Sequence, residues 1–118
     1  MPRSILLRLN DIREAIEGID ELVAGASAET FATSWAMQRA TERALEIISE
    51  ASRHIPEDLK LLAPEMPWRQ IAAIGNLLRH EYQRADVTAT WNIVKEHLPN
   101  LPAAIKRLSI ETERLERD

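Results

Sequence analysis

Cysteine is absent from this chain of 118 residues, so disulfide bonds and thiolate metal sites are excluded. Glycine occurs only three times, and only five residues are aromatic. Long apolar runs are also lacking: the short run at residues 5–7 ends at Arg8, too early for a secretion signal or a membrane span. We therefore expect a soluble, cytoplasmic protein that does not insert into membranes.

The composition is that of a globular domain. Hydrophobic residues make up 45% of the chain and charged residues 29%. The length suits one domain over residues 1–118, with a real core. The net charge of −4 argues against broad, salt-driven binding of nucleic acid, although it leaves room for a local basic site.

Apolar residues recur at helical spacing along the first half of the chain. One stripe predicts a helix over residues 5–23, and Gly25 is a plausible stop. Ser27 or Thr30 is a plausible cap for a second helix, which we expect from residue 28 to residue 54. The residues predicted to form its buried face are Phe31, Trp35, Ala40, Ala44, Ile47, Ile48 and Ala51.

Prolines divide the second half. Residues 57–63 are expected to form one or two helical turns, and Pro67 fits the first turn of a third helix. Asp86 is a candidate cap for a helix over residues 87–97, and Pro99 and Pro102 predict a break or tight turn before a last helical stripe. No strand-like alternation is visible. The pattern predicts an all-α, antiparallel up-and-down bundle of four to five helices. Near-heptad stripes on the first and last helices suit packing within the chain, or a dimer partner.

The segment from Ile74 to Tyr82 concentrates the polar chemistry of the third helix. Asn76 and His80 are four residues apart and share one face, whereas Gly75 and Arg79 share another. Tyr82 is the only tyrosine in the chain. With Arg69 and Arg84 nearby, this is the locally basic part of an acidic protein, and Arg84 is a candidate RNA-binding residue.

These residue types suit the cleavage of RNA without a metal ion. That reaction must remove the proton of the ribose 2′-OH and stabilise charge on the phosphorane. Histidine can accept a proton near neutrality, and arginine binds phosphate oxygens while staying charged. His80 and Arg79 are thus the candidate catalytic residues. Asn76 is a candidate to orient the imidazole or a phosphate, and neither a metal nor another cofactor is required.

Structural interpretations compete with these roles. His80 would then be a structural or surface histidine, Arg79 part of a solvated face, and Tyr82 a helix-end aromatic. Gly75 costs a helix about 0.5–1 kcal/mol relative to alanine, and it serves either close helix packing or room for a ligand or Arg79. Glu42, Glu46 and Glu50 lie at i, i+4 and i+8 without a histidine at ligand spacing, so they predict a solvated or salt-bridged edge.

Two separate segments resemble the HepT-like HEPN family. Residues 43–51, Arg-Ala-Leu-Glu-Ile-Ile-Ser-Glu-Ala, resemble the signature of its second helix. Residues 67–72, Pro-Trp-Arg-Gln-Ile-Ala, resemble its third-helix signature together with Asn76, His80, Glu81 and Tyr82. Residues 91–101 match its closing segment in type and spacing.

The resemblance implies a HEPN-like bundle that forms a homodimer, with the motifs of two subunits facing one cleft. It also implies a metal-independent ribonuclease that is the toxin of a toxin–antitoxin system. The antitoxin would be a small MNT-type nucleotidyltransferase, which in the best-studied branch transfers AMP to the tyrosine of the His-x-Tyr element. Tyr82 holds that position here.

The chain departs from the family motif at one position. The family has an arginine before the asparagine, and this chain has Gly75. Arg79 is the substitute that i to i+4 geometry offers. Two functions therefore stay open: a ribonuclease, or a module that binds a nucleotide or the partner transferase and has lost cleavage through the Arg-to-Gly change. A helical protein without any site is the third interpretation, and a match over two signatures disfavours it.

Overall fold

The computed structural model describes residues 4–80 and 87–117, apart from the side chains of Arg79 and His80. Within these ranges the regular structure is entirely helical, which confirms the predicted all-α class. A π-helical turn, Ile93–His97, and a 3-10 turn, Leu98–Asn100, join the last two helices. The α-helices are, in chain order, α1 (Ile5–Val23), α2 (Ala28–Thr33), α3 (Trp35–Ser52), α4 (Glu57–Lys60), α5 (Trp68–His80), α6 (Val87–Asn92) and α7 (Leu101–Arg117).

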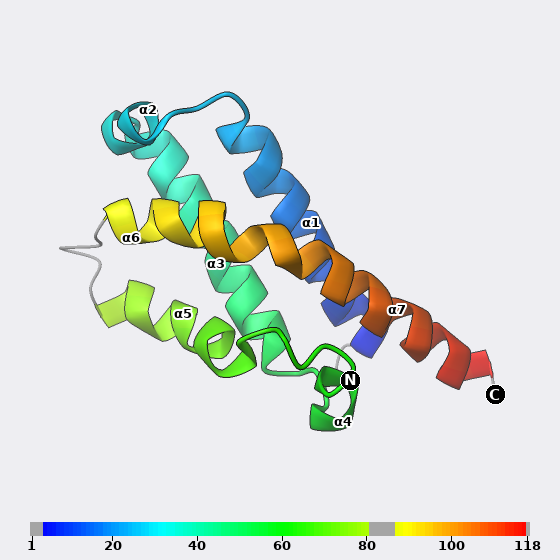
Figure 1. Ribbon diagram of the computed structural model, residues 1–118. Coiled ribbons are helices and arrows are strands. Elements are labelled where there is room, and N and C mark those ends of the chain that lie inside the picture. The colour runs from blue at the N-terminus through cyan, green and yellow to red at the C-terminus, as the bar shows by residue number, and fades with distance from the viewer. Residues whose placement is uncertain (1–3, 81–86, 118) are drawn as a thin grey trace.

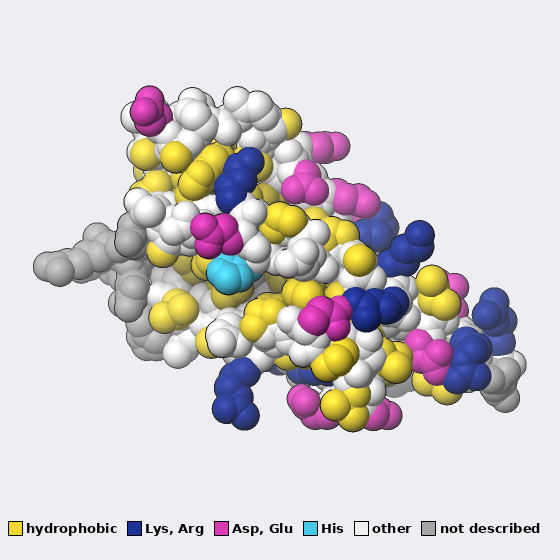
Figure 2. All heavy atoms as spheres, in the orientation of Figure 1, with side chains coloured by type: hydrophobic (Ala, Val, Ile, Leu, Met, Phe, Trp, Pro, Cys, Tyr) yellow, Lys and Arg dark blue, Asp and Glu magenta, His cyan; other side chains and the backbone are white. Residues whose placement is uncertain are grey.

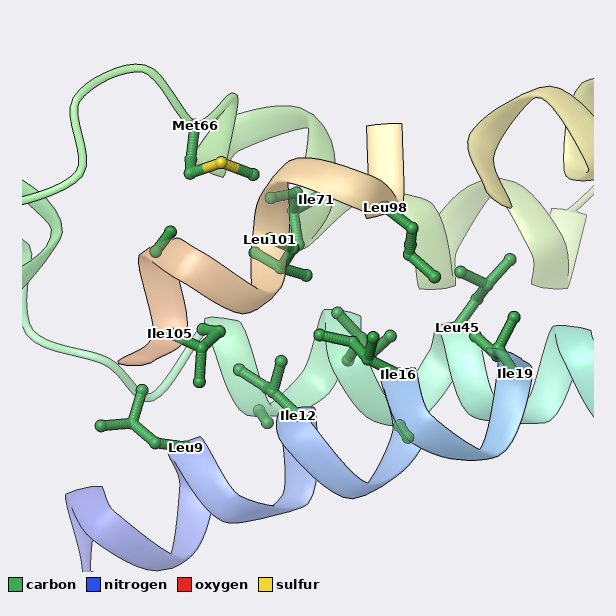
Figure 3. Close-up of a cluster of buried hydrophobic side chains, with 14 of the residues drawn as sticks. Leu9, Ile12, Ile16, Ile19, Leu45, Met66, Ile71, Leu98, Leu101 and Ile105 are labelled. Atoms are coloured by element: carbon green, nitrogen blue, oxygen red, sulfur yellow. The ribbon is translucent and has the colours of Figure 1, made fainter. Parts of the chain in front are cut away.

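The long helices form the antiparallel bundle that the sequence predicts (Figure 1). α1 and α3 pack against each other along their length, α5 packs on α3, and α7 packs on α1. Their apolar stripes meet in one buried cluster, in which Ile12 and Ile16 of α1 lie opposite Leu101 and Ile105 (Figure 3). Among the described residues, no helix combines the length and the apolar character that crossing a membrane requires.

α1 follows its sequence signals closely. The Ser4 hydroxyl accepts the backbone N–H of Leu7 at 3.1 Å and caps the first turn. Gly25 has a φ of +74°, a left-handed conformation that glycine adopts without steric cost, and the chain turns there. Ser27 then caps α2 by accepting the N–H of Thr30. The predicted stripe is confirmed, because its buried members are Leu9, Ile12, Ile16, Ile19 and Val23.

The predicted single helix over residues 28–54 was wrong, because Ser34 divides it. Ser34 has an extended backbone, with φ −104° and ψ 99°, and its hydroxyl accepts the N–H of Met37 to start α3 afresh. Trp35 therefore opens a new helix and is 72% exposed, although it was predicted to be buried. Ala40 is also exposed. The buried aromatic is Phe31, whose ring packs 5.1 Å from that of Trp91 on α6.

The predicted break or tight turn at Pro99 and Pro102 is confirmed as a tight turn, because the 3-10 turn Leu98–Asn100 separates α6 from α7. After α6 the chain forms the wider π-helical turn and then the narrower 3-10 turn, and it continues directly into α7 (Figure 1). The backbone angles at these junctions stay helical. Pro102 lies in the first turn of α7, where a missing N–H removes no helical hydrogen bond. Leu98 and Leu101 are both buried, so this irregular segment stays anchored to the core. The candidate cap Asp86 lies outside the described residues.

Candidate functional site

α5 carries the candidate residues and is fixed to α3 by one serine. The Ser49 hydroxyl donates to the carbonyl of Ala72 at 2.8 Å and accepts the N–H of Gly75 at 3.0 Å. Ser49 is buried, so both bonds are shielded from water. Because Ser49 faces Gly75 while Arg53 faces Ala72, the two helices run antiparallel at this contact.

Gly75 lies at a close contact between the two helices. A Cβ added there would lie 3.2 Å from Oγ of Ser49, which is tighter than ordinary van der Waals contact, and 3.8 Å from Nη2 of Arg53. Of the two interpretations of Gly75, the structure shows the close packing. The predicted role of making room for Arg79 stays a prediction, since the side chain of Arg79 lies outside the described part of the chain.

Arg53 reaches the same contact from the end of α3. Its Nε and Nη2 both donate to the carbonyl of Ala72, at 3.2 and 2.9 Å, and its Nη1 lies 3.5 Å from Glu50. The sequence analysis missed this residue. Arg53 lies four residues after Ser49, which places both on one side of α3, but only the packing reveals that this side meets α5.

Asn76 lies on an exposed edge of α5 beside this contact. Spacings of three and four residues place Arg69, Ala73, Asn76 and His80 along one side of the helix. Arg69 and Ala73 are exposed as well. The backbone of Arg79 and His80 completes α5, so the predicted sharing of a face by Asn76 and His80 holds for the helix geometry.

Tyr82 and Arg84 lie outside the described residues. Their predicted parts, a modification target and an RNA-binding cation, therefore stay predictions. The same holds for catalysis by Arg79 and His80, whose side chains are not described.

The glutamates of α3 form the salt-bridged edge that was predicted. Glu42 pairs with Arg39 at 2.7 Å, and Glu46 pairs with Arg43 at 3.3 Å. Glu50 lies 3.1 Å from Nε2 of His54. The hydrogen bond from His54 lowers the pKa of Glu50 below its ordinary value, and the nearby arginines act in the same direction. In the ranges that the structure describes, no group of side chains is arranged as a metal site.

The charges on the face that α6 and α7 cover are mixed in sign. Figure 2 shows acidic and basic side chains interspersed along α7 on that face. Arg107 pairs with Glu65, and Arg114 pairs with Glu111 at 2.5 Å. A groove between α1 and α7, lined in part by Leu6, Ile16 and Ile105, takes none of its lining from α5. This groove therefore lies apart from the helix that carries Asn76.

Comparisons with known proteins identify the family to which this chain is similar. A family model described as ribonuclease HepT-like matches residues 12–108. A relative from Thermococcus cleftensis, named a probable ribonuclease HepT, is 44% identical over 108 residues, covering 92% of this chain and 98% of that protein. A candidate RNase from Methanocaldococcus jannaschii is 33% identical over 104 residues, covering 88% of this chain and 95% of its own length.

A second protein from Methanocaldococcus jannaschii is named a gamma-glutamylcyclotransferase and candidate RNase. It is 31% identical over 114 residues, which are 97% of this chain and 51% of that protein. This chain therefore corresponds to about half of that relative. No solved structure matches the chain closely enough to count as a relative.

Proposed function

Because this chain belongs to the HepT-like ribonuclease family, we propose that it is a metal-independent endoribonuclease and the toxin of a toxin–antitoxin pair. The observation that supports the proposal most is the family match over residues 12–108 together with Asn76, His80 and Tyr82 at the motif positions. Asn76 lies on the exposed edge of α5, where a substrate as long as RNA can approach it. RNA in the cytoplasm is the proposed substrate.

The proposed reaction is an internal transesterification. His80 takes the proton of the ribose 2′-OH, and the 2′-oxygen attacks the adjacent phosphorus. The bond from phosphorus to the 5′-oxygen breaks, and this oxygen receives a proton from an imidazolium, leaving a 2′,3′-cyclic phosphate and a 5′-hydroxyl. Arg79 balances the charge of the phosphorane, and Asn76, one turn before His80, orients the imidazole or the phosphate.

Two partners belong to the proposal. A homodimer would bring the motifs of two copies to one cleft, so that two histidines are available for proton transfer. An MNT-type nucleotidyltransferase would neutralise the toxin by transferring AMP to the hydroxyl of Tyr82. The added phosphate would carry negative charge into the basic segment around Arg79 and Arg84 and would compete with RNA there.

Cleavage of a labelled single-stranded RNA by the purified protein tests the enzyme. We expect cleavage that survives EDTA and ends in a 2′,3′-cyclic phosphate. The variant His80→Ala should lose at least about a hundredfold in rate, as for removal of a general base. His97→Ala is the matched control, because His97 is exposed on another part of the molecule. A contaminating nuclease would leave both variants equally active.

Absence of cleavage would favour the alternative function. A dimer that binds RNA, a nucleotide or the transferase but does not cleave RNA would be a binding module, which is consistent with the loss of the motif arginine at Gly75.

Loss of RNA cleavage in the variant Arg79→Ala would support the catalytic role of Arg79, whereas full activity in that variant would rule the role out.

The mass of the intact protein tests the antitoxin step. After co-expression with a genetically adjacent MNT-type transferase, we expect the mass to rise by whole AMP units. Tyr82 is the only tyrosine, so Tyr82→Phe should abolish the increase. An unchanged mass beside an active transferase would contradict modification while leaving the ribonuclease proposal intact.

A further inference from the structure

The guanidinium of Arg53 is held in place by hydrogen bonds to α5, and part of it faces solvent. Two of its nitrogens, Nε and Nη2, donate to the single carbonyl oxygen of Ala72. The side chain is 37% exposed, and among the described residues its third nitrogen, Nη1, pairs with the carboxylate of Glu50 at 3.5 Å. We propose that Arg53 binds a phosphate of the RNA strand whose cleavage is proposed at His80. This inference rests on the proposed function and adds a substrate-binding residue to it.

The position of Arg53 along α5 suits this role. Ala72, Asn76 and His80 follow one another at four-residue steps and so lie along one side of α5. Arg53 is bonded to the carbonyl of Ala72, at the beginning of this side, and His80 lies at its end. The distance along the helix is about 12 Å, a few nucleotides at the roughly 3.4 Å rise of a stacked strand. Exposed Arg69 lies two turns before Asn76 on this side. Figure 1 shows the beginning of α5 beside the end of α3, where Arg53 lies.

Arg53 also stands beside the position that lacks the family arginine. Its Nη2 lies 3.8 Å from where a Cβ of Gly75 would be. Ser49 fills the remaining space, so a side chain on residue 75 would need Ser49 to move. The guanidinium of Arg53 at the end of α3 thus lies next to residue 75, where the family has an arginine and this chain has glycine.

The hydrogen bonds that anchor Arg53 to Ala72 favour a role in binding phosphate over a role in joining the helices alone. A guanidinium that is already oriented loses little side-chain entropy when it binds, and its planar fork fits phosphate oxygens. Glu50 is the competing anion, but its carboxylate is also engaged by His54 at 3.1 Å. Removing that negative charge in Glu50→Gln should therefore tighten RNA binding.

Binding of RNA at varied salt concentration tests the proposal. The probe is a labelled 2′-O-methyl RNA, which cannot be cleaved because its 2′-oxygen carries no proton. Arg53→Gln should weaken binding about tenfold at low salt and lower the slope of log K against log salt by about 0.7, the value for one phosphate contact on a single strand. Arg53→Lys keeps the charge and should restore most of the slope.

Arg107 provides the matched control. Its Nη1 donates to the carbonyl of Leu62 at 3.0 Å, and it also pairs with Glu65, so it joins two segments much as Arg53 does. It lies on α7, away from the α3–α5 contact. Arg107→Gln should lower the melting temperature to a similar extent as Arg53→Gln and leave RNA affinity unchanged.

The outcomes separate this inference from the proposed function. If the wild type cleaves RNA and Arg53→Gln keeps the full affinity and slope, Arg53 only joins the helices and the inference fails alone. If Arg53→Gln and Arg107→Gln weaken binding equally, the loss follows stability and the inference fails too. If the wild type neither binds nor cleaves RNA, both proposals fall together.

Discussion

The hydroxyl of Ser49 accepts the backbone N–H of Gly75 at 3.0 Å, and this bond ties the helix that carries His80 to the centre of the bundle. The same hydroxyl donates to Ala72 one turn earlier. Together with apolar packing and the two bonds from Arg53, this oxygen fixes the height and rotation of α5 on α3. These contacts together set the direction in which the Asn76 edge faces.

Removal of this hydroxyl should destabilise the fold. We expect Ser49→Ala to lower the free energy of unfolding by about 1–3 kcal/mol, because two buried hydrogen bonds between helices are lost. Ser52→Ala is the matched control: Ser52 is equally buried, but its hydroxyl bonds only to Ser49 within its own helix. Urea unfolding measures both. If both variants lose the same free energy of unfolding, the hydrogen bonds between α3 and α5 do not stabilise the fold more than a bond within one helix.

Alanine should have opposite effects at two helical glycines. Gly18 is exposed on α1 and has no neighbour within 4 Å of an added Cβ, so Gly18→Ala should stabilise by about 0.5–1 kcal/mol. Gly75→Ala places a Cβ 3.2 Å from Oγ of Ser49, and the crowding should cancel or outweigh that gain.

A double-mutant cycle identifies the source of the crowding. In a Ser49→Ala background, Gly75→Ala should recover much of the gain seen at Gly18, because the oxygen that crowds the new methyl group is absent. The measured quantity is the coupling energy between the two sites from urea unfolding. Additive effects would mean that the backbones of the helices, and not Ser49, limit residue 75.

Two aromatic residues near the break at Ser34 should differ sharply in their effect on stability. Phe31 is fully buried and packs on Trp91, so Phe31→Ala should cost about 3–5 kcal/mol. Trp35 is 72% exposed, and Trp35→Ala should change stability by no more than about 0.5 kcal/mol. Thermal melts followed by circular dichroism compare the two. A large loss from Trp35→Ala would indicate that a partner subunit covers this residue.

Acid should remove the contribution of Glu50. The hydrogen bond from His54 lowers the pKa of Glu50 in the folded protein below its ordinary value of 4.5. The folded state then favours the carboxylate, so this stability is present above pH 4.5 and is lost as the pH falls through the lower folded value. Because Glu50 is exposed, solvent screens the effect, which should be small.

The difference in melting temperature between the wild type and Glu50→Gln measures this contribution. We expect a small gap at pH 7 that closes below about pH 4.5. In a His54→Ala background the gap at pH 7 should shrink, because the main partner of the carboxylate is gone. A gap that stays constant into acid would contradict the assignment.

The sequence predicted those parts of the fold that depend on local pattern. The stripe of α1 and the turn at Gly25 were recognisable because helical periodicity and glycine conformation are local properties. The break at Ser34 was missed because a serine inside an apolar-periodic segment fits either a helix interior or a cap. Pro99 and Pro102 marked the interruption between the last two helices, but their spacing did not show that a π-helical turn and a 3-10 turn form it.

By itself the sequence determined an all-helical chain and the residues with chemistry on α5, since both follow from residue type and spacing. Only the tertiary structure decided what surrounds Gly75. The neighbours there, Ser49 and Arg53, come from a helix more than twenty residues earlier. Their arrival depends on how α3 and α5 align when both bury their apolar faces in the bundle, and that alignment is a property of packing rather than of spacing.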